Sequence, residues 1–354
     1  MGNSFKIEPG LLQAFIRQVR QCKPAEMAST SYEQAYFLHL QAHLEYYTAI
    51  YSSILGEALY LTPKPLADLR IIDYGAGNGM QAVFLKYVGV GQVVVNDLNE
   101  SCITSCKALA TALNLELDGY LQGDVSALEK INQPMDVLLS TDVIEHIYDL
   151  DTCMQEMRRL QPGMLAIFTT ASNPFNKLKV RQLRQLQHRD EFINSADPLE
   201  EGKNAYKMPY FKRRAQLLAE NYAVLSEEEI ELLATRSRGL RKDDMFKLTA
   251  HYLQGGNLPL QAVAKHNTCD PDTGNWTERI LPMNAYKELA DKAGYSFYAS
   301  CGFYNQNGNV VLSWIKRTAN YFIKHFPFAG KFMAPYLVLV FKPVKTPVSI
   351  LEHK

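Results

Sequence analysis

The sequence predicts an α/β fold built on a mostly parallel sheet, and three observations support this prediction. Short apolar stretches, each long enough for one strand, alternate with helical stretches between residues 70 and 170. One apolar stretch breaks directly into a glycine-rich turn at 75–79, and the next ends in an acid, Asp97. Strand–helix–strand repetition builds a parallel sheet with right-handed crossovers, and ligands bind at the carboxyl edge of its strands.

The individual elements follow from periodicity and from turn residues. Apolar residues at helical spacing within residues 11–60 predict an N-terminal group of helices. Ser226 and Glu229 have the spacing of a capping box, which predicts a helix through Ala234. An amphipathic helix is predicted over 311–324. The predicted strands are 70–74, 92–96, 117–121, 136–141, 164–169, 294–302 and 336–341, and the helices of the repeating region are 79–88, 100–113 and 150–160.

Composition excludes several classes of protein. The chain has 354 residues, of which 47% are hydrophobic and 21% are charged, as in ordinary globular proteins. Lys plus Arg equals Asp plus Glu at 37 each, so no overall field favours nucleic acid or an anionic membrane, although a local basic patch is not excluded. No stretch approaches the roughly 18 apolar residues that span a bilayer. The six cysteines are scattered, which predicts reduced thiols in a cytoplasmic protein.

The glycine turn has the pattern Asp73-x-Gly75-x-Gly77-x-Gly79, between a predicted strand and a predicted helix. Glycines let the backbone approach a ligand closely, and a helix N-terminus offers free N–H groups. A dinucleotide site would have its third glycine one residue later, where Met80 stands. The spacing resembles motif I of class I S-adenosylmethionine-dependent methyltransferases, in which the loop wraps the amino-acid part of the cofactor.

The resemblance continues in order along the chain. Asp97 ends the second strand, where family members bind both ribose hydroxyls, and a carboxylate can accept two hydrogen bonds from a cis-diol. Asp124 and Val125 follow the third strand, where the family contacts adenine, and Leu160-Gln-Pro-Gly163 resembles the turn before its fifth strand. The resemblance implies S-adenosylmethionine as cofactor, bound by Asp73, Gly75, Ala76, Gly77, Gly79, Asp97, Leu98, Asp124, Val125 and Thr141.

The resemblance also implies a complete architecture. The expected fold is the Rossmann-like class I methyltransferase fold, a seven-stranded, mostly parallel sheet with helices on both faces and an antiparallel pair of final strands. In this interpretation residues 1–64 form an N-terminal helical cover, 65–170 the cofactor-binding core, 171–290 a helical substrate-recognition insertion between strands five and six, and 291–354 the last strands with an amphipathic helix. One departure from the family is Tyr74, where a small aliphatic residue is more usual.

The segment Asp142-x-x-Glu145-His146 follows the fourth strand, where an acceptor would meet the methyl group. These three residues are the predicted catalytic group, with Asp142 or His146 as a general base. Similar patterns bind a divalent ion in ubiquinone-pathway O-methyltransferases and small-RNA 2′-O-methyltransferases. One alternative is therefore a Mg or Zn site of Asp142, Glu145, His146 and His188. The other is a loop-orienting role, because Glu-His also occurs here in class I enzymes that bind no metal.

Three further features each leave two interpretations open. The basic run at 177–189 suits a phosphate-bearing substrate or a solvated helix face. Trp276, in a turn-rich loop, suits a lid or a core anchor. The aromatic and basic residues at 322–332 suit peripheral membrane contact, or a helix packed under the final hairpin. Asn173-Pro-Phe175 is interpreted as a turn that ends the fifth strand.

The preferred function is methyl transfer from S-adenosylmethionine to oxygen on a small hydroxylated molecule, such as a metabolite or a sugar, by in-line attack. One alternative is a metal-dependent RNA 2′-O-methyltransferase, which the balanced charge disfavours. Another is a catalytically silent, cofactor-binding scaffold. The expected partner is a small-molecule acceptor rather than a nucleic acid.

Overall fold

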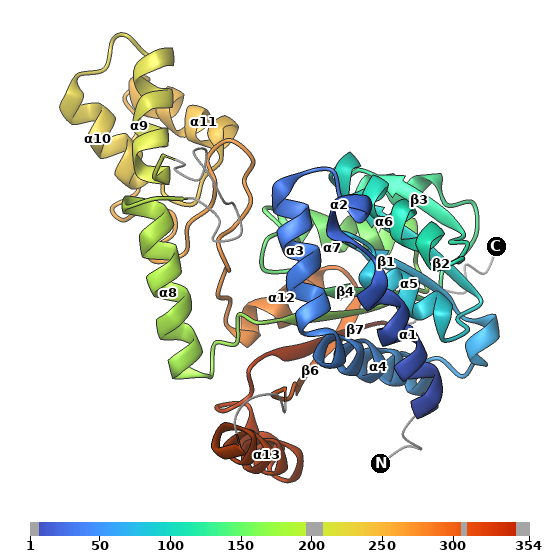
Figure 1. Cartoon of the computed structure of the whole chain (residues 1–354). Coiled ribbons are helices and arrows are strands. Elements are labelled where there is room, and N and C mark those ends of the chain that lie inside the picture. Colours follow the sequence, from blue (N-terminus) through green and yellow to red (C-terminus); the bar gives the residue numbers. More distant parts are fainter. Residues whose placement is uncertain (1–6, 196–207, 306–309, 345–354) are drawn as a thin grey trace, which may run out of the picture.

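A computed structural model describes residues 7–195, 208–305 and 310–344. Its centre is a seven-stranded sheet in the order β3-β2-β1-β4-β5-β7-β6 (Figure 1). The first five strands are parallel, and β7 is antiparallel to both β5 and β6, which confirms the predicted fold class. The strands are β1 Arg70–Tyr74, β2 Gln92–Asp97, β3 Gly119–Gln122, β4 Val137–Thr141, β5 Leu165–Thr170, β6 Tyr295–Cys301 and β7 Leu337–Pro343.

The strand order determines where a ligand can bind. After β1 the chain moves outward through β2 and β3, and it then returns to place β4 on the other side of β1. The switch point of the sheet therefore lies between β1 and β4, and in open α/β sheets ligands bind outside the carboxyl ends of the strands at this point. The turn after β1 and the loop after β4 both lie at this edge.

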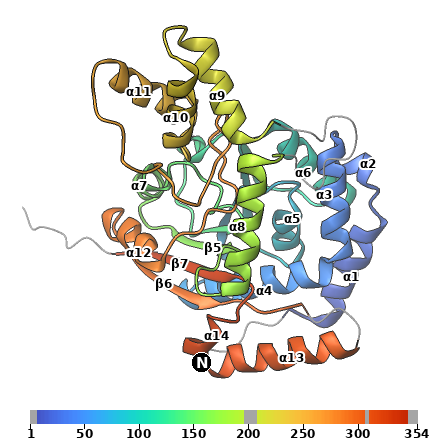
Figure 2. The same cartoon turned by 90° about the vertical axis from the view of Figure 1, so that its left-hand side faces the viewer.

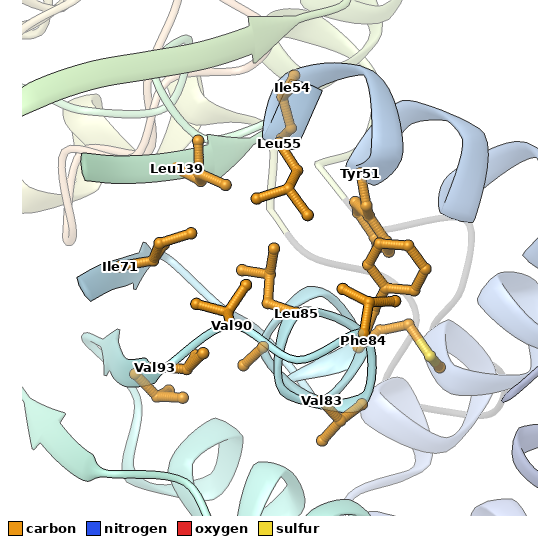
Figure 3. Packing of buried hydrophobic residues seen from close by; sticks show 14 of the residues in the cluster. Tyr51, Ile54, Leu55, Ile71, Val83, Phe84, Leu85, Val90, Val93 and Leu139 are labelled. Carbon is orange, nitrogen blue, oxygen red and sulfur yellow. The ribbon is translucent and has the colours of Figure 1, made fainter. Parts of the chain in front are cut away.

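Helices cover both faces of the sheet, and each face has its own apolar core. One core joins the sheet to α1 Pro9–Gln21, α4 Leu44–Leu61, α5 Met80–Tyr87 and α6 Glu100–Ala112. Figure 3 shows part of it, where Leu55 of α4 and Leu85 of α5 pack towards Ile71 and Leu139 of the sheet. The other core contains α7 Leu150–Leu160 and α12 Met283–Lys292. The shorter elements of this part are α2 Pro24–Met27, α3 Ser31–Ala42, and the 3-10 helices η1 Leu66–Asp68 and η2 Val125–Lys130.

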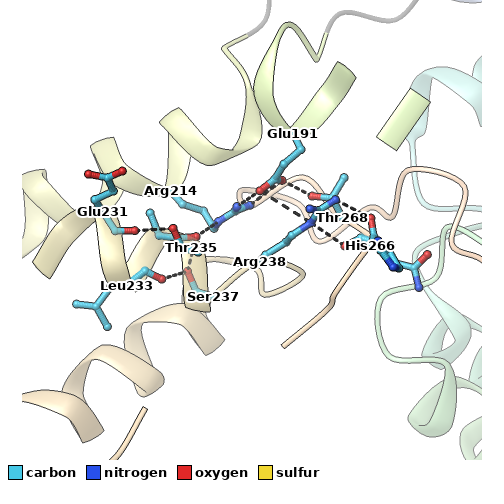
Figure 4. A network of polar contacts seen from close by, with 11 residues as sticks. Glu191, Arg214, Glu231, Leu233, Thr235, Ser237, Arg238, His266 and Thr268 are labelled. Carbon is cyan, nitrogen blue, oxygen red and sulfur yellow. Dashed lines mark hydrogen bonds and ion pairs between the residues drawn. The ribbon is translucent and has the colours of Figure 1, made fainter. Parts of the chain in front are cut away.

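A helical group stands beside the sheet and has a third apolar core of its own (Figures 1 and 2). It contains α8 Lys177–Phe192, α9 Tyr210–Asn221, α10 Glu227–Arg236 and α11 Lys242–Leu253. The predicted capping box of Ser226 and Glu229 is present at the start of α10. Arg214 of α9 is fully buried and pairs with Glu191 of α8, whose Oε2 also accepts from the Thr268 hydroxyl at 2.6 Å (Figure 4).

The remaining elements are α13 Val310–His325 and α14 Pro327–Gly330, between β6 and β7. The strands and helices predicted between 70 and 170 agree with the structure to within two residues. All six cysteines are free thiols, as predicted. Among the described residues, none of the helices has both the length and the apolar character that crossing a bilayer requires.

Candidate active site

The turn after β1 depends on glycine for its backbone conformation and for its packing. The backbone angle φ is +68° at Gly75, +55° at Gly77 and +79° at Gly79, a region that side chains disfavour. A Cβ atom on Gly79 would also lie 2.2 Å from the sulfur of Cys106 in α6. A Cβ atom on Gly75 would lie 2.6 Å from a methyl group of Val143. The turn is thus pressed against both α6 and the loop after β4.

Asp97 ties the end of β2 to this turn. Its Oδ2 accepts a hydrogen bond from the Gly77 N–H at 2.8 Å, and its Oδ1 accepts from the Asn99 N–H at 2.9 Å. The side chain is buried, which raises its pKa, while the two backbone hydrogen bonds oppose that shift. A carboxylate has about four lone-pair sites, so Asp97 keeps acceptor capacity for a ligand diol.

The ends of β2 and β3 bring the other predicted adenosine contacts together. Asn96, which the sequence analysis did not identify, donates from Nδ2 to the carbonyl oxygens of Leu121 at 3.2 Å and Gly123 at 3.0 Å. Leu98 is 67% exposed, an apolar surface that an adenine ring could cover. The exposed Asp124 caps η2 by accepting from the Ser126 N–H at 3.0 Å, and Val125 is buried behind it.

A series of side-chain hydrogen bonds links Asp73 and Thr141 of the sheet through Gln81 of α5. The Gln81 side chain donates to Asp73 Oδ1 at 2.7 Å and accepts from the Thr141 hydroxyl at 2.6 Å. Burial raises the pKa of Asp73 to about 7. Gln81 was missed, although it is a polar residue within an otherwise apolar, buried segment of α5.

Two buried groups beside the glycine turn fit a polar ligand. Within the described residues, Asp73 Oδ2 and both polar side-chain atoms of Asn78 are buried without a hydrogen-bond partner. Such groups are rare in folded proteins and need a physical explanation. The amino-acid part of S-adenosylmethionine carries an ammonium and a carboxylate, which are a donor and an acceptor of the required kinds. The residues at this edge therefore fit the implied cofactor.

The N-terminal helices cover the glycine turn from outside the sheet. Tyr36 of α3 lies so close that a Cβ atom on Gly77 would be 3.5 Å from its ring. Glu33 of α3 is buried and accepts a hydrogen bond from the Ser105 hydroxyl of α6 at 3.5 Å. The sequence did not show which side chains of these helices would lie beside the glycine turn.

Asp142 lies in a strained position at the end of β4. Its φ is +55°, unusual for a residue with a side chain, and its N–H donates to the Thr169 carbonyl oxygen at 3.2 Å. Part of the side chain is exposed, but the surrounding protein limits its hydration and raises its pKa to about 6. The negative charge of Glu278 adds to this increase, while His146 and Lys179 oppose it. Backbone strain and a shifted pKa together are typical of functional positions.

Three tyrosines of the N-terminal helices lie within electrostatic range of Asp142. Burial raises the pKa of Tyr46 and Tyr47, to about 12 for Tyr47, and the nearby charge of Asp142 adds to both shifts. The Tyr46 hydroxyl donates to the Phe303 carbonyl oxygen at 3.1 Å, and the two rings meet edge to face at 6.0 Å. Tyr36 also lies within electrostatic range of Asp142. The raised pKa values keep the hydroxyls of these tyrosines protonated at neutral pH.

His146 is fixed by a segment that lies 130 residues further along the chain. Its Nδ1 lies 2.7 Å from the carbonyl oxygen of Trp276, and its own carbonyl oxygen accepts from the Trp276 N–H at 3.3 Å. A carbonyl oxygen can only accept, so Nδ1 carries the proton and, in the neutral ring, Nε2 keeps a lone pair. Nε2 lies 3.9 Å from Glu278 Oε1. Glu278 was not identified from the sequence, because only the fold brings it to this edge.

Trp276 is a core anchor rather than a lid. Its side chain is 6% exposed and stacks on Tyr148, with ring centroids 6.0 Å apart. The indole N–H donates to the Tyr148 carbonyl oxygen at 3.2 Å. Trp276 thus holds the loop after β4 through both its backbone and its side chain.

Glu145 lies beneath this loop. It is 1% exposed, and its Oε1 accepts from the Ala171 N–H at 3.1 Å. Burial and the nearby charges of Asp142 and Glu278 raise its pKa well above the usual value. Its backbone carbonyl accepts from the Arg279 N–H at 3.2 Å. This placement suits a group that orients the loop better than one that contacts an acceptor.

The predicted metal ligands do not assemble. Across residues 7–195, 208–305 and 310–344, no group of three or more His, Cys, Asp and Glu side chains is arranged to hold a metal ion. His188 is exposed on α8, where its ring meets Phe192 at 5.1 Å, whereas the adjacent Gln187 points inward and donates to the Glu278 carbonyl oxygen at 2.8 Å. The prediction that His188 joins Asp142, Glu145 and His146 in a metal site is therefore wrong, because His188 lies on the exposed face of α8.

Comparison with known proteins agrees with this geometry. A family model described as a methyltransferase domain matches residues 66–214. Residues 66–214 are therefore similar to methyltransferase domains. The match begins just before β1 and ends within α9, so it contains the glycine turn, Asp97, and the loop after β4.

Curated proteins similar to this chain include the ubiquinone biosynthesis O-methyltransferases of Rickettsia bellii and Ruegeria pomeroyi. Each is 32% identical, over 106 and 115 residues respectively, which cover 30% and 32% of this chain. The matched regions are 43% and 46% of those relatives, so the chain spans less than half of their length. A solved SAM-dependent methyltransferase from Archaeoglobus fulgidus is 12% identical with a TM-score of 0.40, covering 87% of this chain and 99% of that one.

Proposed function

We propose that this chain transfers a methyl group from S-adenosylmethionine to a hydroxyl oxygen of a small acceptor. The observation that carries the proposal is the convergence, at one edge of the sheet, of a complete glycine turn and the half-enclosed carboxyl group of Asp142. The family match over residues 66–214 supports the donor. The names of the curated relatives, which are O-methyltransferases, support oxygen as the acceptor atom.

The chain's own residues have separate roles in holding the cofactor. Asp97 would accept from the ribose hydroxyls, and Leu98 and Val125 would border the adenine beside Asp124. Asp73 and Asn78, with the N–H groups of the turn, would meet the amino-acid part. The bound cofactor supplies an electrophilic methyl group on its sulfonium, and the protein contributes alignment with the acceptor oxygen.

His146 is the best candidate for the general base. The Trp276 carbonyl oxygen fixes the proton on Nδ1, which leaves Nε2 as the acceptor for an incoming hydroxyl proton. Glu278, 3.9 Å from Nε2, would stabilise the imidazolium that results. Asp142 would then bind and orient the acceptor hydroxyl, and Glu145 would act as a positioning residue from below.

The surroundings of Asp142 favour an aromatic acceptor. Tyr36, Tyr46 and Tyr47 lie on the cover side of this carboxyl group, and Phe303 extends the aromatic border. Aromatic side chains stack well on planar apolar ligands. A hydroxylated aromatic molecule is therefore the acceptor class that this border fits best.

Calorimetry with S-adenosylmethionine and S-adenosylhomocysteine tests the donor. The unmodified protein should bind both, and Asp97→Ala should weaken binding by at least about tenfold because both ribose hydrogen bonds are lost. Asp151→Ala, on α7, is the matched acidic control and should bind as the unmodified protein does. Absence of binding in the unmodified protein would refute the proposal at its base.

Release of S-adenosylhomocysteine in the presence of a panel of hydroxylated aromatics tests the acceptor. His146→Ala should lower turnover by roughly 10²-fold or more if His146 is the base, with cofactor affinity unchanged. Tight cofactor binding without turnover on any acceptor would instead favour a silent scaffold. Turnover that is unaffected by His146→Ala would leave in-line positioning as the main source of the acceleration.

A further inference from the structure

The helix α13 and the short helix α14 expose a large amount of apolar surface. Only Ile323 of α13 and Gly330 of α14 are buried, and Figures 1 and 2 show α13 lying outside the sheet, beyond β6. Their exposed apolar side chains include Val310 at 86%, Val311 at 68%, Trp314 at 70%, Ile315 at 53%, Tyr321 at 58%, Phe322 at 46% and Phe328 at 77%. The expectation of a helix packed under the final hairpin does not describe this arrangement. We propose that α13 and α14 form a docking surface for an anionic lipid bilayer.

The exposed residues of α13 form a stripe rather than a scatter. At about 3.6 residues per turn, Val311, Trp314, Ile315 and Phe322 fall on one side of the helix. Asn320 falls on the opposite side, and the buried Ile323 lies on one flank of the stripe. The basic residues Arg317 and Lys324 fall on the other flank. Apolar residues on one side with basic residues beside them are typical of helices that lie in the plane of a membrane.

The unit is attached to the body of the protein by polar contacts that leave its apolar stripe uncovered. The Asn320 side chain accepts from the Tyr304 N–H at 2.8 Å and donates to the Tyr304 carbonyl oxygen at 2.9 Å. After α14, the Asn173 side chain donates to the carbonyl oxygens of Lys331 and Ala334, each at 2.9 Å. The turn predicted at Asn173 is therefore present, and it also holds this unit in place.

The charge of this region has one sign. Residues 301–343 contain five Lys and Arg residues and no Asp or Glu, although the whole chain has equal numbers of both kinds. The helices α13 and α14 thus carry basic side chains and no acidic ones, which complements anionic headgroups. Trp314 and Tyr321 add amphipathic rings, which prefer the headgroup region of a bilayer.

The basic side of α8 begins next to α14 and extends this surface. Phe175, just before α8, meets Phe332 edge to face at 5.8 Å, and the ammonium group of Lys331 lies 4.4 Å from the Phe175 ring centroid. One side of α8 then forms an open groove of about 580 Å³, lined by Pro174, Lys177, Val180, Arg181, Arg184, Gln185 and His188. Lys331 therefore lies over this aromatic pair, and cationic side chains of α8 line the groove that begins at the neighbouring Pro174.

Docking in this way would bring the acceptor side of the protein to the lipid surface. Tyr304, which Asn320 of α13 holds, follows Phe303, and Phe303 contacts Tyr46 beside Asp142. The proposed bilayer contact and the aromatic border of the candidate active site are thus joined by two consecutive residues. The docking proposal itself does not depend on methyl transfer.

The two tryptophans provide a direct test with the full-length protein. Trp314 is exposed and Trp276 is buried. A blue shift of tryptophan fluorescence on adding vesicles would therefore show that Trp314 of α13 has entered the bilayer, because the emission of Trp276 should not change. Vesicles of phosphatidylglycerol and phosphatidylcholine should give the shift and should sediment with the protein. Pure phosphatidylcholine should bind at least about tenfold more weakly, because several basic residues each contribute roughly fivefold near an anionic surface. Trp314→Phe should abolish the shift and retain sedimentation.

A matched pair of variants locates the surface. Ile315→Glu/Phe322→Glu places two charges on the stripe and should reduce vesicle binding by at least about tenfold. Val224→Glu/Leu260→Glu adds the same two charges at highly exposed apolar positions in the insertion and should bind as the unmodified protein does. Unchanged affinity for S-adenosylhomocysteine in both variants would show that the fold is intact.

Three results would overturn the proposal. They are no sedimentation with anionic vesicles at low salt, binding that the stripe variant does not weaken, and equal binding to neutral and anionic vesicles. Light scattering could give a fourth such result. If the unmodified protein is a dimer that does not bind vesicles, and the stripe variant is a monomer, then a second copy of the chain covers this surface. None of these results depends on whether the protein transfers a methyl group.

Discussion

The glycine turn after β1 and the loop after β4 lie at the same edge of the sheet, but they are built from different parts of the chain. The turn is held by Asn96 and Asp97, which follow it by about twenty residues. The loop is held by Trp276, Glu278 and Arg279, more than a hundred residues further on, and is bordered by tyrosines from the N-terminal helices. The hydrogen bonds that hold the turn, on the cofactor side, therefore join residues close in sequence, whereas those that hold the loop, on the acceptor side, form only once distant parts of the chain have folded together.

Arg214→Met should have the largest effect on the free energy of unfolding. It should also show whether the cofactor side is independent of the distant part of the chain that holds the acceptor side. Arg214 and Glu191 are both fully buried, and removing one partner of a buried ion pair costs about 3–5 kcal/mol because the remaining charge loses its main partner. Arg238, 4.0 Å from Glu191, compensates this charge only in part. Urea denaturation should show this loss of free energy of unfolding. Calorimetry should show S-adenosylmethionine affinity reduced less than fivefold, because the glycine turn has no contact with this pair.

Arg213→Met is the control for this prediction. Arg213 is the neighbouring residue and pairs with Asp272 at 2.8 Å, but both side chains remain about one-third or more exposed. Exposed pairs contribute roughly 0–1 kcal/mol, so the free energy of unfolding should change little. If Arg214→Met abolished cofactor binding while the protein stayed folded, the two sides would not be independent.

Asp73→Asn should have the next largest effect on the free energy of unfolding, and the size of this effect should depend on pH. The pKa of the Asp73 carboxyl group is raised by burial to about 7 in the folded protein, against 3.8 when it is unfolded. Its protonated form therefore stabilises the fold fully below about pH 4, and this contribution is lost as the pH rises through 7. This difference between the folded and unfolded pKa corresponds to about 4 kcal/mol. The variant should therefore be more stable than the unmodified cofactor-free protein by up to that amount at pH 8.5.

Urea unfolding of both proteins at pH 5.5, 7.0 and 8.5 provides the measurement. Asparagine keeps the oxygen that accepts from Gln81, so the series of hydrogen bonds to Thr141 is preserved in the variant. The advantage of the variant should shrink steadily as the pH falls. An advantage that is constant across the three pH values, or absent at pH 8.5, would contradict the assignment to Asp73.

Trp276→Phe should affect the acceptor side alone, and its effect on the free energy of unfolding should be smaller than that of Asp73→Asn or Arg214→Met. Phenylalanine can still pack on Tyr148, but it leaves the Tyr148 carbonyl oxygen without the indole donor, at a cost of about 1 kcal/mol. A less firmly held loop should lower turnover several-fold, measured as S-adenosylhomocysteine release, with unchanged cofactor affinity. Trp314→Phe, at the exposed tryptophan, should leave both unchanged. A matching loss of cofactor affinity in Trp276→Phe would show that the anchor also supports the glycine turn.

This division explains what the sequence could predict. The strands from 70 to 170 and the cofactor residues follow from short-range patterns, since a strand, a glycine turn and an acid at a strand end are all visible within about thirty residues. Gln81 and Asn96 were within the same range and were missed, because buried polar residues that support a site have no fixed motif. Glu278 and the tyrosine border were beyond any local pattern, because they depend on how the insertion and the cover fold back onto the sheet.

His188→Ala should have the smallest effect, and its contrast with Gln187→Ala tests how α8 is oriented. Gln187 is buried and donates to the carbonyl oxygens of Thr277 and Glu278 at 3.1 and 2.8 Å, whereas His188 is exposed beside Phe192. Turnover and cofactor affinity should change less than twofold in His188→Ala, while Gln187→Ala should lower turnover by disturbing Glu278. Calorimetry with Mg²⁺ and Zn²⁺ should give the same result for His188→Ala as for the unmodified protein. A metal affinity that falls about tenfold or more in His188→Ala would mean that α8 rotates this side chain towards Asp142 and His146, and that the metal-assisted mechanism applies after all.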